Sequence, residues 1–314
     1  MSDIDIDALY DAFCSGLPAD VRVGARALGH TLGLVPSPEV PWGSVFKNEV
    51  TLGAPVLFAE GMVDVGRPLV EKAAFAHMLS VIEAFGSDRI ADAQVDDTPE
   101  LRRLLSLIRA TRDDALESVG GPASRALATD ADRLTHEAID GERRLLLSGE
   151  ATDLDTYQRL SAGKQAVGFP ASVALATVAG WTAARLDTLE RTLMGVWLGL
   201  QHQDDVADWE DDARRGGAWI VAVAGGAPAE ERTDATALRQ HVFSSGILAR
   251  VLDLACERYA EAAAGARMLG ARRLAEWADA RRAEATAQAE GERKSPGFVD
   301  RQRRLNAWRA EVLG

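Results

Sequence analysis

The chain has 314 residues, of which 47% are hydrophobic and 26% are charged, so it has enough apolar side chains for a substantial core. Its formal net charge is −13, from 35 basic and 48 acidic residues, which argues against proteins that wrap the backbone of a nucleic acid. Its two cysteines, Cys14 and Cys256, suggest neither a disulfide framework nor a zinc site. No apolar run reaches the ~18 residues that a membrane span needs. We therefore expect a soluble, cytoplasmic protein that is not integral to a membrane.

Apolar residues recur at helical spacing along almost the whole chain, and no convincing period-two strand is found. The stretch from Val35 to Gly66 is rich in proline and glycine and is expected to be mostly irregular. The sequence therefore predicts an all-α protein. Helices are expected near 4–15, 19–33, 67–95, 99–118, 122–148, 153–179, 182–212, 234–264, 268–290 and 298–312.

No polar linker of suitable length divides the chain, so we expect a single domain over residues 1–314. Within it, 1–66 would hold N-terminal helices and the irregular segment, and 67–314 would form the main bundle. A glycine-rich segment over 216–234 interrupts the helices, and it fits either a mobile flap or a plain surface loop.

An acidic series ends the apolar helix expected near 67–95. Asp88, Asp92 and Asp96 recur at i, i+4 and i+8. Like charges at this spacing destabilise a helix, as do acids near its C-terminus, so a counter-cation is expected. For Asp96, a place in the loop before the next helix fits equally well.

A second acidic series follows residues 193–200, which are apolar on every side, as in a helix buried all round. Asp204, Asp208 and Asp212 fall within about 80° of arc on one helix face. Carboxylates without a His or Cys partner indicate Mg²⁺ or Mn²⁺ and not zinc. A solvated acidic face is the alternative, but carboxylates at the end of a buried helix need partners.

The stretch Leu200–Asp208, LQHQDDVAD, resembles the second aspartate-rich motif of trans-prenyl diphosphate synthases, Phe-Gln-x-x-Asp-Asp-x-x-Asp. Its continuation, Asp211–Gly216, resembles the end of the equivalent motif in phytoene and squalene synthases. The spacing of Asp204, Asp208 and Asp212 is also similar to the metal triad of class I terpene synthases. All three groups belong to the class I isoprenoid synthase superfamily. The resemblance implies a helical bundle with a central active-site cavity, in which two acidic helix ends clamp Mg²⁺ and a diphosphate.

The resemblance also implies roles for the aspartates of both series. The first series departs from the family pattern Asp-Asp-x-x-Asp, because Arg89 or Ala93 stands at its second position. The expected catalytic residues are Asp92, Asp204 and Asp208. The expected metal ligands are Asp88, Asp92, Asp96, Asp204, Asp205, Asp208 and Asp212.

Four basic residues are expected to bind the diphosphate. The segment Tyr157–Lys164 resembles the part of prenyl synthases in which a tyrosine precedes a diphosphate-binding lysine, which assigns this role to Lys164. Arg159 stands close to where terpene synthases place a diphosphate-sensing arginine. Arg214 and Arg215 could close over the leaving group, and Arg suits bidentate phosphate contacts.

Three aromatic residues, Phe85, Phe169 and Trp197, are expected to line the pocket, where their faces can stabilise a carbocation. For each of them, ordinary core packing is the alternative.

Two departures from the family bear on the reaction. Residues Asp20–Ala27 contain nothing like the Gly-Gly-Lys-x-x-Arg-Pro motif with which prenyl elongases bind isopentenyl diphosphate. The Lys and Pro that often follow the second motif are replaced by Gly217–Trp219. One-substrate chemistry is therefore favoured.

We expect a terpene synthase or cyclase, a lyase that ionises a C15 or C20 allylic prenyl diphosphate and releases pyrophosphate. The alternatives are a prenyltransferase, either a trans-prenyl diphosphate synthase or a head-to-head condensing enzyme, and a non-catalytic homologue that keeps the scaffold. We also expect a homodimer.

Overall fold

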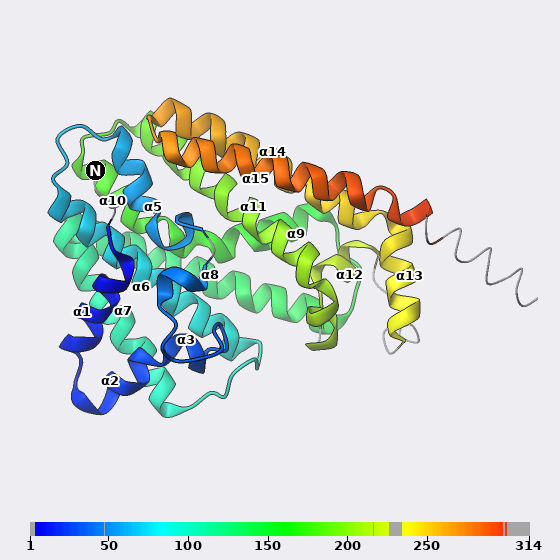
Figure 1. Ribbon diagram of the computed structural model, residues 1–314, viewed down its shortest axis with the longest axis horizontal. Coiled ribbons are helices and arrows are strands. Elements are labelled where there is room, and N and C mark those ends of the chain that lie inside the picture. The colour runs from blue at the N-terminus through cyan, green and yellow to red at the C-terminus, as the bar shows by residue number, and fades with distance from the viewer. Residues whose placement is uncertain (1–3, 47, 216, 226–233, 298, 300–314) are drawn as a thin grey trace, which may run out of the picture. The chain divides into compact units, whose positions relative to one another are not determined.

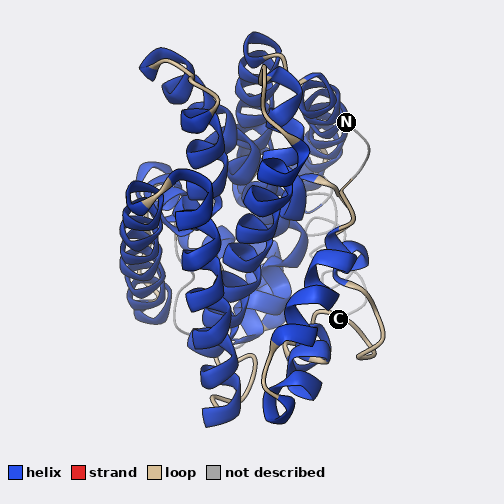
Figure 2. Cartoon of the chain, turned by 90° about the vertical axis from the view of Figure 1, so that its left-hand side faces the viewer, coloured by secondary structure: helices blue, strands red, loops and turns tan. Residues whose placement is uncertain are grey.

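The computed structural model describes residues 4–46, 48–215, 217–225, 234–297 and 299. Every regular element in these ranges is a helix, which confirms the predicted all-α class (Figure 2). The helices up to residue 120 are α1 (Ile6–Gly16), α2 (Ala19–Arg26), α3 (Leu28–Thr31), α4 (Trp42–Val45), α5 (Val50–Phe58), η1 (Ala59–Gly61), α6 (Arg67–Ala91) and α7 (Pro99–Gly120). They are followed by α8 (Pro122–Ser148), α9 (Leu154–Lys164), η2 (Gln165–Gly168), α10 (Pro170–Val178), α11 (Ala183–Arg215), α12 (Trp219–Val223), α13 (Ala235–Ser245), α14 (Ile247–Leu269) and α15 (Arg272–Glu292).

Contacts divide the chain into two compact units, each with a core of its own. Four long helices that Figure 1 labels, α8, α11, α14 and α15, contribute residues to both units. The organisation as one domain stays a prediction. The first unit comprises the described residues within Met1–Ile139, Lys164–Leu193 and Ala264–Ala275, and the second those within Asp140–Gly163, Met194–Ala263 and Glu276–Gly314.

Helix α6 is the core helix of the first unit. Met78, Leu79 and Ile82 on this helix are fully buried. Their cluster includes Phe13 of α1 and Ile108 of α7, and burial of such side chains stabilises the fold by roughly 1.5–3 kcal/mol each. The packing fixes where the acidic C-terminal end of α6 lies in this unit.

The stretch over 35–66 is more helical than its composition predicts, and the expectation of a mostly irregular segment is wrong for α5. Pro55 lies inside that helix and has no N–H, so the carbonyl of Thr51 loses its usual donor. The Nε2 atom of His77 on α6 lies 3.0 Å from this carbonyl oxygen and replaces that donor. Burial lowers the pKa of His77 to about 4, so the ring is neutral.

Two predicted helices are divided by residues that break helices locally. The helix expected over 153–179 is split into α9, η2 and α10, and Pro170 begins α10, where its missing N–H has no consequence. The helix expected over 234–264 is split at Gly246, whose φ of +69° lies in the left-handed region.

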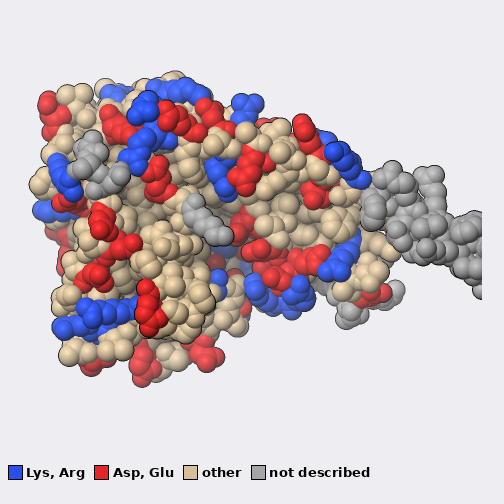
Figure 3. All heavy atoms as spheres, in the orientation of Figure 1, with Lys and Arg blue, Asp and Glu red and all other residues tan. Residues whose placement is uncertain are grey.

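The helix expected over 298–312 lies outside the described residues except for residue 299, as does much of the segment over 216–234. None of the described helices is both long and apolar enough to cross a membrane. On the face drawn in Figure 3, acidic and basic side chains of the described residues are interspersed.

Candidate functional site

The first acidic series lies at the C-terminal end of α6, in the first unit. The helix ends at Ala91, Asp92 is its C-cap, and Ala93 has a left-handed φ of +53°. The predicted continuation to residue 95 is therefore wrong, because the chain turns away from the helix axis here. Asp92 is exposed, and Asp96 lies in the connection to α7 instead of on the helix face that carries Asp88.

The carboxylate of Asp88 faces the ammonium of Lys164. Their Oδ1 and Nζ atoms are 3.3 Å apart, and the two side chains are 31% and 14% exposed. This Oδ1 atom is shielded from solvent and accepts no hydrogen bond from the described residues, so the ion pair compensates its charge. Both residues belong to the site expected from the sequence, Asp88 as a metal ligand and Lys164 as a diphosphate ligand, and not as partners of each other.

A buried ionic network lies further back on α6. Glu83, only 3% exposed, accepts hydrogen bonds from Ser87 at 3.0 Å and from Arg109 of α7 at 2.5 Å. Arg112, 1% exposed, donates to both carboxylate oxygens of Asp132 on α8, at 2.7 and 2.8 Å. Sequence reasoning missed this network, although a glutamate within an apolar helix is a signal that could have indicated it.

The second acidic series lies on α11, in the second unit. Because this helix continues to Arg215, the series Asp204, Asp208 and Asp212 does share one face, within about 80° of arc. Asp204 and Asp208 are exposed. Asp208 makes no hydrogen bond or ion pair with the described residues, whereas Asp212 lies 3.5 Å from Arg215.

Asp205 points away from this face and is 6% exposed. The Tyr157 hydroxyl of α9 donates to its Oδ2 atom, and the Gln201 amide donates to its Oδ1 atom at 2.9 Å. Burial, and then the charge of Asp205, raise the pKa of Tyr157 well above its ordinary value, so the tyrosine keeps its proton. Asp205 is thus an anchor between α9 and α11, and its role as a metal ligand stays a prediction.

His202 completes this buried network. Its Nδ1 atom lies 2.8 Å from the Tyr157 oxygen, whose own proton is directed at Asp205, so the network assigns the ring proton to Nδ1. Burial, and then the charge of Arg258, lower the pKa of His202 to about 3. Its buried Nε2 atom has no partner among the described residues. The predicted site did not include His202 or Tyr157. The polar triplet Gln201-His202-Gln203 directly after the apolar stretch 193–200 was a signal that could have indicated His202.

Small residues on α11 allow α14 to approach closely. A Cβ atom added to Gly195 would lie 2.7 Å from the carbonyl oxygen of Arg258, and one added to Gly199 would lie 2.6 Å from the Tyr259 ring. The Tyr259 hydroxyl also donates to the Gln203 amide oxygen at 2.6 Å. These contacts fix the register of α11 and therefore the direction of its aspartates.

The predicted arginines lie at exposed positions in the second unit. Arg214 pairs with Asp211 at 2.6 Å and Arg215 with Asp212, in both cases one turn back on the same helix. Arg159 is exposed on α9. Their diphosphate-binding roles stay predictions.

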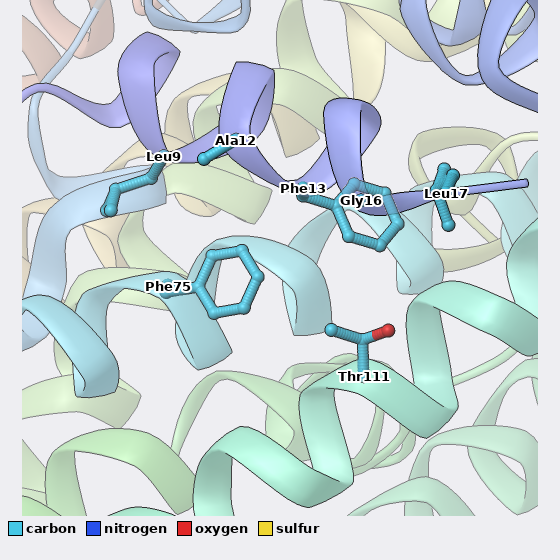
Figure 4. A pocket seen from close by; sticks show the side chains of 7 residues that line it. All are labelled: Leu9, Ala12, Phe13, Gly16, Leu17, Phe75 and Thr111. Carbon is cyan, nitrogen blue, oxygen red and sulfur yellow. The ribbon is translucent and has the colours of Figure 1, made fainter.

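The three predicted pocket residues lie in different settings. Phe85 is 36% exposed and packs on Phe46, with ring centroids 5.0 Å apart, while Phe169 is half-buried before α10 and Trp197 is buried in α11. The first unit also has an apolar hollow of about 420 Å³ between α1, α6 and α7, which Figure 4 shows. Its lining contains none of the three and consists of Leu9, Ala12, Phe13, Gly16, Leu17, Phe75 and Thr111.

The donor groups of the two helix ends differ in how well they suit a magnesium ion. Within the described residues, no three His, Cys, Asp or Glu side chains converge on a point that could hold a metal. Mg²⁺ commonly takes one or two protein carboxylates and completes its shell with water and phosphate oxygens. Asp204 and Asp208, exposed and one turn apart, fit that requirement. Asp88, already facing an ammonium, does not.

Comparisons with known proteins show which class of proteins shares this fold. No protein-family model and no curated protein match this sequence. Among solved structures 49 chains match, and the fold is that of the class I isoprenoid synthases, as trans-polyprenyl diphosphate synthases display it. The predicted resemblance is therefore confirmed at the level of the fold.

Three of these structures have names that concern prenyl-chain synthesis. Geranylgeranyl pyrophosphate synthase from Lactobacillus brevis has a TM-score of 0.71 and 15% identity, and the match covers 88% of this chain and 95% of that one. A polyprenyl synthase from Caulobacter crescentus, complexed with calcium and isoprenyl diphosphate, has a TM-score of 0.67 and 17% identity, over 90% and 94% of the chains. A polyprenyl synthetase from Streptomyces coelicolor has a TM-score of 0.66 and 16% identity, over 92% and 99%.

Proposed function

We propose that this chain is a divalent-metal-dependent enzyme that transfers the prenyl group of a prenyl diphosphate to a second substrate. The observation that carries the proposal is the exposed pair Asp204 and Asp208, on a helix held in register by buried contacts, within the fold of prenyl-chain synthases. A structural neighbour complexed with calcium and isoprenyl diphosphate supports the ligand class. The preference for a cyclase drawn from the sequence thus becomes the second candidate.

In this mechanism the protein binds and orients, and it needs no nucleophile of its own. Asp204 and Asp208 would hold Mg²⁺, which, when bound, neutralises the charge that develops on the departing diphosphate. The binding of a diphosphate by Lys164 stays a prediction from the sequence resemblance. Asp205 and Tyr157 would act as positioning residues, because their hydrogen bond fixes the turn of α11 that carries Asp204.

A cyclase acting on one substrate has its own support in α2, which covers the region where elongases carry their second-substrate motif. This helix contains no lysine, Arg22 donates to the Leu17 carbonyl at 3.0 Å, and Asp20 pairs with Arg103 at 2.6 Å. Asp20 and Arg22 are therefore engaged within the protein, which favours chemistry without a second diphosphate.

The test is incubation of the full chain and Mg²⁺ with geranyl, farnesyl or geranylgeranyl diphosphate, each with and without isopentenyl diphosphate. Pyrophosphate release and gas chromatography–mass spectrometry of the products give the result. Product that forms only with isopentenyl diphosphate supports the transferase, and product from the allylic substrate alone supports the cyclase. If no allylic diphosphate releases pyrophosphate under either condition, the proposal is wrong.

A further inference from the structure

The apolar hollow of the first unit lies along one face of α1, and the proposed reaction does not use it. Figure 4 shows the Phe13 and Phe75 rings next to each other, with centroids 6.4 Å apart, and Thr111 of α7 on the far side. The lining residues of α1 run from Leu9 to Leu17, so the hollow extends for about 12 Å at about 1.5 Å per residue. Its volume of about 420 Å³ is in the range of small-molecule sites.

The lining of this hollow suits hydrocarbon and not polar groups. Its one polar side chain is that of Thr111, whose hydroxyl already donates to the Leu107 carbonyl at 2.9 Å. A polar group placed there would lose its hydrogen bonds to water without replacement, which is costly. Ala12 and Gly16 are exposed on α1, and a Cβ atom added to Gly16 meets nothing within 4 Å. A hydrocarbon chain can therefore enter from solvent on this side.

A lysine lies beside the hollow on α6. Lys72 precedes Phe75 by three residues, so the two share one side of the helix, and the Phe75 side chain leans toward the turn of Lys72. Lys72 is exposed, and its ammonium makes no hydrogen bond or ion pair with the residues that the structure describes. The adjacent Glu71 pairs with Arg67 at 2.7 Å. An ammonium at the edge of an apolar hollow is complementary to an anion that carries a hydrocarbon chain.

The carboxylates of α1 do not cancel this complementarity. Asp5 caps the N-terminus of α1, whose partial positive charge offsets its own, and Asp7 accepts a hydrogen bond from a backbone amide at 2.8 Å. Asp11 lies about 200° around the helix from Leu9, which places it on the side away from the hollow.

We propose that the hollow binds a free single-chain amphiphile with an anionic head, its chain beside Phe13 and Phe75 and its head at the Lys72 ammonium. A single short hollow with a single lysine matches one chain and one head, which favours a ligand from solution over the two-chain lipids of a bilayer. The site is independent of the proposed reaction, because its residues all belong to the first unit and none is an expected metal or diphosphate ligand.

The probe is decyl phosphate, titrated calorimetrically into the full chain without metal and below its critical micelle concentration. Each buried methylene group should tighten binding by up to about fourfold, so octyl phosphate should bind about four- to sixteenfold more weakly. Decanol, which has the chain without the charge, should bind about two- to fivefold more weakly than decyl phosphate.

Gly16→Leu fills the hollow from α1. It should weaken decyl phosphate binding by about tenfold or more, because the new side chain displaces at least two methylene groups of the ligand. The matched control is Gly24→Leu on α2, where an added Cβ atom also meets nothing within 4 Å. Ala12→Leu fills the same hollow from the middle of α1 and provides a second variant, and circular dichroism verifies that each variant is folded.

Lys72→Gln tests the place of the anionic head. It should weaken decyl phosphate binding by about two- to fivefold and leave decanol binding unchanged, because only the charged head loses its partner. Lys294→Gln, which neutralises an exposed lysine of the second unit, should change neither.

The proposal is wrong if wild type does not bind decyl phosphate, if Gly16→Leu and Ala12→Leu bind it as wild type does, or if Gly24→Leu loses as much affinity. A second copy of the chain is the other occupant to consider. Sedimentation equilibrium in which Gly16→Leu converts a dimer into a monomer, with decyl phosphate binding unchanged, would make the hollow a subunit interface instead. Binding to phosphatidylglycerol vesicles that Gly16→Leu abolishes, without binding of decyl phosphate, would make it a membrane contact and also overturn the proposal.

Discussion

The C-terminal parts of α6 and α11 have the same sequence pattern but different structures. In both segments an apolar, buried stretch of helix is followed by aspartates at i, i+4 and i+8. On α6 the helix stops at Ala91 and the first aspartate pairs with a lysine. On α11 the helix runs on to Arg215, and its exposed face keeps Asp204 and Asp208. The chemistry of a carboxylate series therefore depends on where its helix ends and on which cations pack against it.

The strongest way to break this comparison is to neutralise one aspartate on each helix. Asp208→Asn should reduce pyrophosphate release by about a hundred- to a thousandfold, because a group that stabilises the leaving diphosphate is lost. Asp92→Asn should reduce it less, because α6 ends at Ala91 and does not carry its acidic series further along one helix face. Steady-state pyrophosphate release, with circular dichroism to verify helicity, measures both. Equal losses of pyrophosphate release would show that the aspartates at the two helix ends contribute equally to the reaction.

The buried histidine of α6, His77, should make the free energy of unfolding depend on pH. Burial lowers the pKa of His77 from 6.5 to about 4, so between these values the unfolded chain binds more protons than the folded one. The free energy of unfolding should therefore fall as pH drops from about 6.5 to about 4, by about 3 kcal/mol from this group. His77→Gln, which keeps an N–H donor for the Thr51 carbonyl, should remove that part of the slope in urea titrations. A slope identical to wild type would contradict this assignment.

The anchoring of α11 can be compared with a similar tyrosine in the first unit. Tyr157→Phe removes a hydrogen bond to the buried carboxylate of Asp205 and should lower the free energy of unfolding by about 2 kcal/mol. Tyr10→Phe removes a 2.7 Å hydrogen bond to the neutral carbonyl of Ala25 and should lower it by about 1 kcal/mol. Urea denaturation of both variants gives the difference. If Tyr10→Phe is the more damaging, Asp205 does not depend on Tyr157.

The smallest expected effect compares one glycine on each acidic helix. In Gly195→Ala of α11 the new methyl group would meet the backbone oxygen of Arg258 at 2.7 Å, and a backbone cannot swing aside. In Gly86→Ala of α6 it would meet the end of the Leu105 side chain, which can rotate. We expect the α11 variant to be less stable by about 1 kcal/mol, measured by thermal melting. The reverse order would mean that α14 can move away from α11.

Much of the fold could be predicted because its signals are local. Helical periodicity and helix-start residues such as Thr98, which caps α7 with a hydrogen bond to the Leu101 amide, depend on neighbours in sequence. The acidic face of α11 follows from the same rule, since Asp204 and Asp208 are one turn apart.

The features that sequence did not reveal depend on partners far away in the chain. Lys164 lies 76 residues after Asp88, and no local pattern couples the two. Tyr157 reaches Asp205 across 48 residues, which changes the aspartate from a candidate ligand into an anchor. The early end of α6 is marked by Ala93, whose backbone is left-handed. Alanine rarely adopts this conformation, so the sequence alone does not predict it.

The proline in α5 has a consequence for the order in which this protein folds during synthesis. Thr51 and His77 are 26 residues apart, so the helix around Pro55 gains its substitute donor only after much of α6 has left the ribosome and packed. A truncated product ending before residue 67 should therefore lack α5, whatever its other helices do. The N-terminal part of the nascent chain thus waits for the helix that follows it before its own structure is complete.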